Sequence, residues 1–69
     1  MKLTINGILE EVELEDNNIL ELLAIKEVKM PEAVSVEING NIIKKNDFET
    51  HSMNEGDEIE FLYYMGGGM

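Results

Sequence analysis

The chain has no cysteine, no arginine and no tryptophan, and it has one proline and one histidine. Without cysteine it can form no disulfide, no thiolate zinc site and no cysteine nucleophile, so packing alone must hold the fold. The single histidine, His51, has no patterned acid nearby. We expect it to be a solvated loop residue, and we expect no metal site. No apolar run approaches the ~18 residues that a membrane span needs.

The charge of the chain is strongly unbalanced. Five basic and fifteen acidic residues give a net charge of −10 at pH 7. Nucleic acids and anionic membrane surfaces are recognised by clustered Lys and Arg, so both are poor partners for this chain. A basic protein partner is favoured, because opposite potentials steer the encounter. The N-terminal residues alternate like a strand and show no signal peptide, so we expect a cytoplasmic location.

The length of 69 residues allows one domain. A chain this short buries only about 60% of the surface that it exposes when unfolded, so a deep catalytic cleft is hard to build. No nucleophile–base pair or metal cluster is visible either. We therefore do not expect a conventional enzyme, and we expect no cofactor to be bound by the chain itself.

The sequence begins with a hairpin pattern. Residues 1–5 alternate between apolar and polar, which is typical of a half-buried strand. Asn6-Gly7 follows, and this pair favours a two-residue type I′ turn, in which both residues need φ > 0. The return strand has glutamates in one phase and apolar residues in the other. This predicts an inward face made of Ile8, Val12 and Leu14.

One helix is predicted between about residues 18 and 27. Asp16-Asn17-Asn18 supplies candidate N-cap residues, and Pro31 marks the far limit. Apolar residues then repeat at helical spacing. The stripe expected to face the core consists of Leu20, Leu23 and Ala24, widened by Ile19 and Leu22.

A second hairpin pattern and a final strand follow the helix. Residues 34–38 alternate, Asn39-Gly40 repeats the turn signal, and residues 42–44 form a short return strand. Residues 46–53 have no clear period and predict an irregular segment with one short turn. Residues 58–64 alternate again and predict the closing strand.

The element order is therefore β-β-α-β-β-β. A single helix must cover one face of a mixed sheet of four to five strands, and it supplies a crossover long enough for a parallel pairing. This predicts an α+β protein with the β-grasp, or ubiquitin-like, fold. The domain is expected over residues 1–64, followed by a flexible glycine-rich tail over residues 65–69.

The tail reads Met65-Gly66-Gly67-Gly68-Met69. Glycine has no Cβ, so this backbone is thin enough to enter a narrow channel. Residues 65–68 span at most about 13–14 Å when extended, at ~3.3–3.6 Å per residue. The tail could thus reach a partner's active site while the folded body docks outside.

The chain resembles the ubiquitin-like sulfur carriers, most closely those of thiamine biosynthesis. The resemblance covers the whole chain and rests on four segments. They are residues 1–7 (MKLTING), 36–40 (VEING), 54–57 (NEGD) and, most specifically, 58–68 (EIEFLYYMGGG).

The resemblance implies a reaction at the terminal glycine, here Gly68. In this family an E1-like adenylyltransferase uses ATP and magnesium to adenylate the glycine carboxylate. Sulfur from a cysteine persulfide donor then displaces AMP and leaves a thiocarboxylate, and a thiazole synthase takes up that sulfur. Met65, Gly66 and Gly67 would thread the partner's active site.

One departure from the family is the residue after Gly68. Working carriers end in Gly-Gly, whereas here Met69 follows. We expect a carboxypeptidase or a JAMM-type metalloprotease to remove Met69 before activation. Some carriers for cysteine or homocysteine synthesis are extended in the same way, so they remain an alternative, as does the small subunit of molybdopterin synthase.

Leu62 and Tyr64 lie in the opposite phase to the apolar residues of the last strand. An exposed apolar pair beside the tail suggests a docking surface for partner enzymes. The competing hypothesis is a ubiquitin-like interaction module whose glycine tail is inert.

Overall fold

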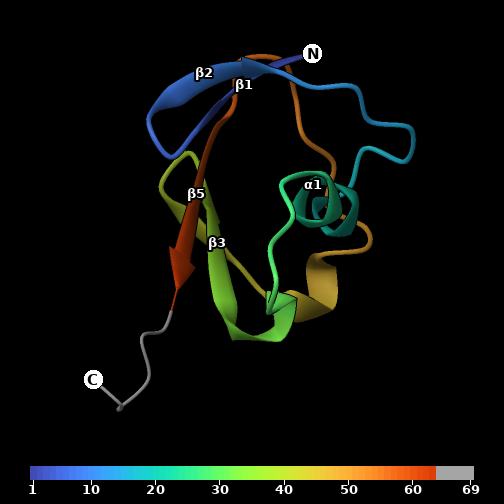
Figure 1. The fold of residues 1–69 in the computed structure, drawn as a ribbon, viewed down its shortest axis with the longest axis vertical. Helices are drawn as coiled ribbons and strands as arrows, with labels where there is room; N and C mark the ends of the chain where they lie inside the picture. The colour runs from blue at the N-terminus through green and yellow to red at the C-terminus, as the bar shows by residue number, and fades with distance from the viewer. Residues whose placement is uncertain (64–69) are drawn as a thin grey trace.

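The computed structural model describes residues 1–63, with side chains described as far as Leu62. This part of the chain contains strands, one α-helix and two short 3₁₀ turns (Figure 1). In chain order they are β1 (Lys2–Ile5), β2 (Ile8–Glu11), α1 (Ile19–Ile25), η1 (Pro31–Ala33), β3 (Val34–Ile38), β4 (Asn41–Ile43), η2 (Lys45–Asp47) and β5 (Glu58–Tyr63). None of the helices in these residues is long and apolar enough to cross a membrane.

The strands form one mixed sheet in the order β2-β1-β5-β3-β4. The central pair, β1 and β5, is parallel, and the other neighbours are antiparallel. Helix α1 lies across one face of this sheet (Figure 1). The predicted α+β fold, a β-grasp with a mixed sheet and one covering helix, is confirmed.

Both Asn-Gly pairs form the turns that the sequence predicts. Asn6 and Gly7 have φ of 51° and 85°, and Asn39 and Gly40 have φ of 53° and 86°. Asparagine and glycine tolerate this left-handed region better than other residues, which explains why these pairs close the two hairpins.

Helix α1 begins where it was expected to begin. Asn18 is the N-cap, and its Oδ1 accepts a hydrogen bond from the Glu21 N–H at 2.8 Å. The Glu21 carboxylate reaches back and accepts from the N–H groups of Glu15, Asp16 and Asn17 at 2.6, 2.8 and 2.9 Å. These bonds, led by the one from Glu15, lower the pKa of the Glu21 carboxyl against a weaker opposing effect of desolvation.

The helix ends earlier than residue 27. Lys26 is the C-cap, and Glu27 adopts a left-handed conformation with φ of 58°. The Glu27 N–H donates to the Ala24 carbonyl at 3.1 Å, and the Val28 N–H donates to the Leu23 carbonyl at 3.0 Å. This pair of bonds is a Schellman motif, which usually has glycine where Glu27 stands, so the sequence carries no glycine signal for the helix end.

The buried face of α1 also differs from the predicted stripe. Ile19, Leu22 and Leu23 are buried, whereas Leu20 is 44% exposed and Ala24 is exposed too. The Phe48 carbonyl accepts hydrogen bonds from the N–H groups of Ile19 at 3.0 Å and Leu20 at 3.4 Å. This contact ties the first helical turn to the irregular segment and helps to fix which side of the helix meets the sheet.

The inward face predicted for the second strand is only partly correct. Val12 is buried and Leu14 packs against the core, but Ile8 is 63% exposed. Ile8 pairs with Ile5 at the end of the hairpin on an edge strand, so its side chain lies at the margin of the sheet. Strand β2 itself ends at Glu11.

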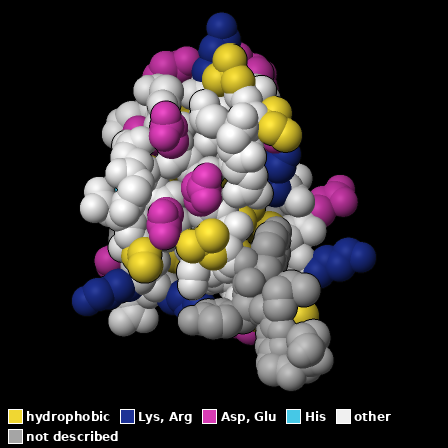
Figure 2. Space-filling view, turned by 90° about the vertical axis from the view of Figure 1, so that its left-hand side faces the viewer, with side chains coloured by type: hydrophobic (Ala, Val, Ile, Leu, Met, Phe, Trp, Pro, Cys, Tyr) yellow, Lys and Arg dark blue, Asp and Glu magenta, His cyan; other side chains and the backbone are white. Residues whose placement is uncertain are grey.

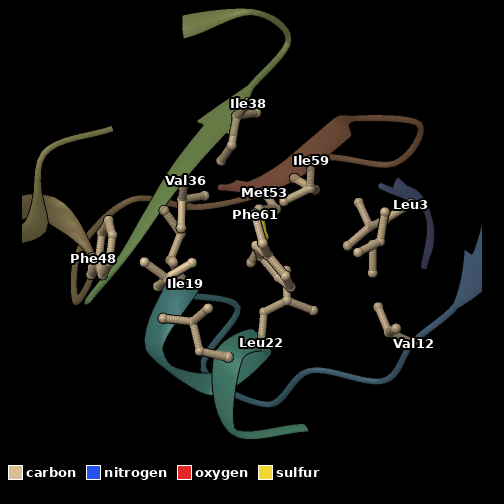
Figure 3. Packing of buried hydrophobic residues seen from close by; sticks show 13 residues of the cluster. Leu3, Val12, Ile19, Leu22, Val36, Ile38, Phe48, Met53, Ile59 and Phe61 are labelled. Carbon is tan, nitrogen blue, oxygen red and sulfur yellow. The ribbon is translucent and has the colours of Figure 1, made fainter. Parts of the chain in front are cut away.

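The core lies between the inner sheet face and α1 (Figure 3). The core cluster joins strand residues such as Leu3, Val36 and Ile59 with Ile19 and Leu22 of the helix. No polar or charged residue is buried among the described side chains. The irregular segment adds two core residues that its missing periodicity did not predict. These are Phe48, 4% exposed, and Met53, 1% exposed.

Candidate functional site

The last strand presents one face to the core and the other to solvent. Ile59 and Phe61 are buried, whereas Glu58, Glu60 and Leu62 are exposed on the outer face. Leu62 keeps 42% of its surface exposed at the end of β5 that leads to the tail. The predicted phase of the strand is therefore correct, and Leu62 lies on the outer face as expected.

The outer face around Leu62 is acidic. The register places Glu37 of β3 opposite Glu60, and Ile42 of β4 opposite Glu37. Ile42 is 67% exposed. Figure 2 shows acidic side chains in the middle of this face and hydrophobic ones beside the grey residues. A partner that covers this face would match it with basic groups and an apolar contact.

Two asparagine side chains hold β5 from its two sides. Asn6 Oδ1 accepts a hydrogen bond from the Phe61 N–H at 2.8 Å, and Asn39 Oδ1 accepts one from the Glu58 N–H at 3.0 Å. The main-chain N–H groups of Asn6 and Asn39 donate to the Ile59 and Glu58 carbonyls at 2.9 and 2.8 Å. Each turn thus closes a hairpin and also fixes the strand that leads to the tail.

The sequence analysis did not identify this second role of the asparagines. The Asn-Gly signal predicts a turn, but it does not show which strand lies beside the turn. Only the strand order, with β5 between β1 and β3, brings both asparagine side chains to the same strand.

The predicted tail residues lie outside the described part of the chain. Tyr64, Met65, Gly66, Gly67, Gly68 and Met69 all follow Tyr63, so their roles stay predictions. The docking role of Leu62 is likewise still a prediction, although its exposure is established.

Nothing in residues 1–63 gathers three or more His, Asp or Glu side chains into a metal-binding group. His51 is half-buried rather than fully solvated. A pocket of about 270 Å³ lies between the helix and the two 3₁₀ turns, lined by Leu20, Pro31, Glu32, Lys45 and Phe48. The Lys45 ammonium donates to the Glu32 carbonyl at its margin, and the lining contains no nucleophile beside a base.

These features define a small β-grasp protein with an acidic outer sheet face. Its central strand, β5, is followed in the sequence by a glycine-rich tail. The ThiS family model matches residues 2–68, and the chain belongs to the ThiS family.

Two solved structures are similar to the chain over its length. One is the crystal structure of the thiamine biosynthesis protein ThiS from Geobacter metallireducens, with 40% identity and a TM-score of 0.85, covering 99% of this chain and 100% of that one. The other is an NMR solution structure of a thiamine biosynthesis protein from the same organism, with 41% identity and a TM-score of 0.80, covering 100% and 90%. No curated protein matches the chain significantly.

Proposed function

We propose that the chain is a sulfur carrier that delivers sulfur for the thiazole ring of thiamine from a thiocarboxylate on Gly68. The observation that carries the proposal is the family match, which runs from residue 2 to residue 68 and so ends on the last glycine. The two similar structures are of thiamine biosynthesis proteins, which supports the choice of product.

The chemistry needs an activating partner because a carboxylate is a poor electrophile. An E1-like adenylyltransferase of the ThiF type, using ATP and Mg²⁺, joins the Gly68 carboxylate to AMP and releases pyrophosphate. The terminal sulfur of a cysteine persulfide donor attacks the carbonyl carbon and AMP leaves. A thiol then releases the donor cysteine as a disulfide, and the thiocarboxylate remains on Gly68. A thiazole synthase of the ThiG type accepts the sulfur.

The carrier contributes delivery rather than catalysis. It has no cysteine, so it cannot hold the persulfide itself. Met65, Gly66 and Gly67 thread into the partner's active site, while Leu62 and Tyr64 dock outside it. Activation and sulfur transfer use the same tail, so the two enzymes bind in turn.

Met69 must be removed before Gly68 can react. A carboxypeptidase or a JAMM-type metalloprotease exposes the glycine carboxylate. This step predicts that a chain ending at Gly68 is charged by the activating enzyme alone, and that the chain ending at Met69 needs the protease as well.

Rescue of a bacterial strain that lacks its own thiamine sulfur carrier tests the function. We expect a chain ending at Gly68 to restore growth without thiamine. A matched chain ending at Gly67 keeps a Gly-Gly end but is shorter by one residue, about 3.3–3.6 Å, so its carboxylate should not reach the nucleotide and it should fail. If growth is restored only for cysteine, homocysteine or molybdopterin synthesis, the sulfur goes to a different acceptor. If no pathway is restored although the chain is folded and present, the interaction module is the better hypothesis.

A further inference from the structure

Strand β5 is paired unequally along its two edges. On the β3 side the register covers every position from Ile59 to Tyr63. On the β1 side it covers only Glu58 and Ile59. Figure 1 shows β5 continuing beyond the β1–β2 hairpin toward the grey trace. Within residues 1–63, the half of β5 next to the tail therefore has a neighbouring strand on one edge only.

The hydrogen bonds show which way the main-chain groups of this half point. The main-chain N–H and C=O of Glu58 both bond with Asn39 on the β3 side. The main-chain groups of the alternate residues Glu58, Glu60 and Leu62 therefore point toward β3. The main-chain groups of the residues between them point toward the β1 side. The Ile59 carbonyl accepts from the Asn6 N–H, and the Phe61 N–H donates to Asn6 Oδ1.

Asn6 is the last group of the β1–β2 hairpin that reaches this edge. The Phe61 carbonyl and the Tyr63 N–H point to the same side, and within residues 1–63 no strand is paired with them. Asn6, Gly7 and Ile8 at the end of the hairpin are all exposed, so solvent reaches the place where β1 ends. A sheet edge of this kind can accept an extended segment from another protein.

We propose that the activating enzyme adds an extended segment to this edge, in line with β1 and hydrogen-bonded to the Phe61 carbonyl and the Tyr63 N–H. The inference rests on the proposed function, because it names how the same strand is held during activation. A strand added here fixes the direction in which the chain leaves Tyr63. The tail is then aimed at the nucleotide before the carboxylate reacts.

Charge selects the kind of segment. Glu58 and Glu60 lie exposed on the outer face of β5, and the whole chain carries a charge of −10. A segment with Lys or Arg among its outward-facing residues complements this strand. A second copy of the chain would bring its own Glu60 and another −10 to the same place, so we assign the edge to the basic segment of an enzyme.

A matched pair of substitutions at Tyr63 isolates the main-chain contact. Tyr63→Pro and Tyr63→Ala remove the same ring, but only proline also removes the N–H that points to the open edge. Proline is tolerated at a strand position whose N–H faces away from the sheet. The affinity of each full-length variant for the E1-like enzyme of the source cells is measured with ATP and Mg²⁺. We expect Tyr63→Pro to bind at least about fivefold more weakly than Tyr63→Ala, because it leaves a buried acceptor on the enzyme unpaired.

Amide hydrogen exchange of the wild-type chain provides a measurement that needs no variant. We expect the enzyme to slow exchange at Tyr63. Equal affinities of the two variants, or unchanged exchange at Tyr63 in the complex, would overturn the inference. A dimer of the free chain that Tyr63→Pro dissociates would assign the edge to a second copy and also overturn it. Charging of an otherwise wild-type chain that ends at Gly68, by the same enzyme preparation, separates this failure from failure of the proposed function.

Discussion

The hydrogen bond from the Phe61 N–H to Asn6 Oδ1 gives the sharpest prediction about how β5 is held. The bond is 2.8 Å long, partly buried, and joins residues 55 positions apart. Asn6→Gly keeps a residue that tolerates the observed φ of 51° and removes the acceptor. Glycine relieves left-handed strain but adds freedom to the unfolded chain, and these effects oppose each other. The remaining loss is one hydrogen bond, about 1 kcal/mol of unfolding free energy, or roughly 4–8 °C in Tm for a domain of this size.

Urea unfolding and amide exchange together test this prediction. Asn6→Asp is the matched control, because it keeps an acceptor at the same position and should stay within about 0.5 kcal/mol of wild type. In Asn6→Gly, exchange should accelerate at the Phe61 amide and much less at the Leu62 amide, which faces β3. Equal stability of the two variants, or equal acceleration at Phe61 and Leu62, would refute the reasoning that Asn6 holds the strand.

Four further predictions test other parts of the account. Glu27→Gly should raise the unfolding free energy by about 1 kcal/mol in urea titrations, because glycine suits the left-handed position that follows α1. An unchanged unfolding free energy would contradict the claim that Glu27 is strained there. Phe48→Ala should cost about 3–5 kcal/mol, whereas the exposed neighbour substitution Glu49→Ala should stay within about 0.5 kcal/mol by the same measurement. The pKa of the Glu21 carboxyl is lowered from its ordinary value of 4.5. The hydrogen bonds of the Glu21 carboxylate therefore stabilise the fold above pH 4.5, and this contribution is lost as the pH falls through the folded-state pKa. Acid titrations should therefore show a smaller loss of stability for Glu21→Gln, and identical acid curves would argue against this role. Leu62→Ala should lower the unfolding free energy by less than about 1 kcal/mol, because the side chain is 42% exposed. The same substitution should raise the KM of the activating enzyme for the carrier. An unchanged KM would show that Leu62 is not part of the docking surface.

The sequence predicted the sheet well because its signals are local. Alternation in residues 34–38 and 58–64 reports a strand with one buried face, and Asn6-Gly7 and Asn39-Gly40 report tight turns. These features depend on neighbouring residues alone, so they survive in the folded chain.

The errors arose where a distant contact decides the outcome. The apolar residues of α1 fit two possible buried faces that differ by one residue. The contact that helps to choose between them comes from the Phe48 carbonyl, which bonds with the first helical turn from a segment without periodicity. Ile8 has the phase of an inward residue but lies at the margin of the sheet, where no helix covers it. The end of α1 at Ile25 was missed for a local reason, because Glu27 stands where glycine is the usual signal.

The candidate site was predicted in part for the same reason. Exposure of Leu62 follows from the alternation of its own strand. The open edge beyond Asn6 follows instead from the strand order and from the lengths of β1 and β5, which no single segment of the sequence reveals.

The central claim is that Gly68 carries sulfur as a thiocarboxylate. Intact-mass measurement of the chain tests it most directly, after incubation with lysate of its source cells, ATP, Mg²⁺ and a sulfur source. The account predicts loss of Met69 together with replacement of one oxygen by sulfur at the new terminus. An unchanged mass, in a lysate that charges a known carrier, would contradict it.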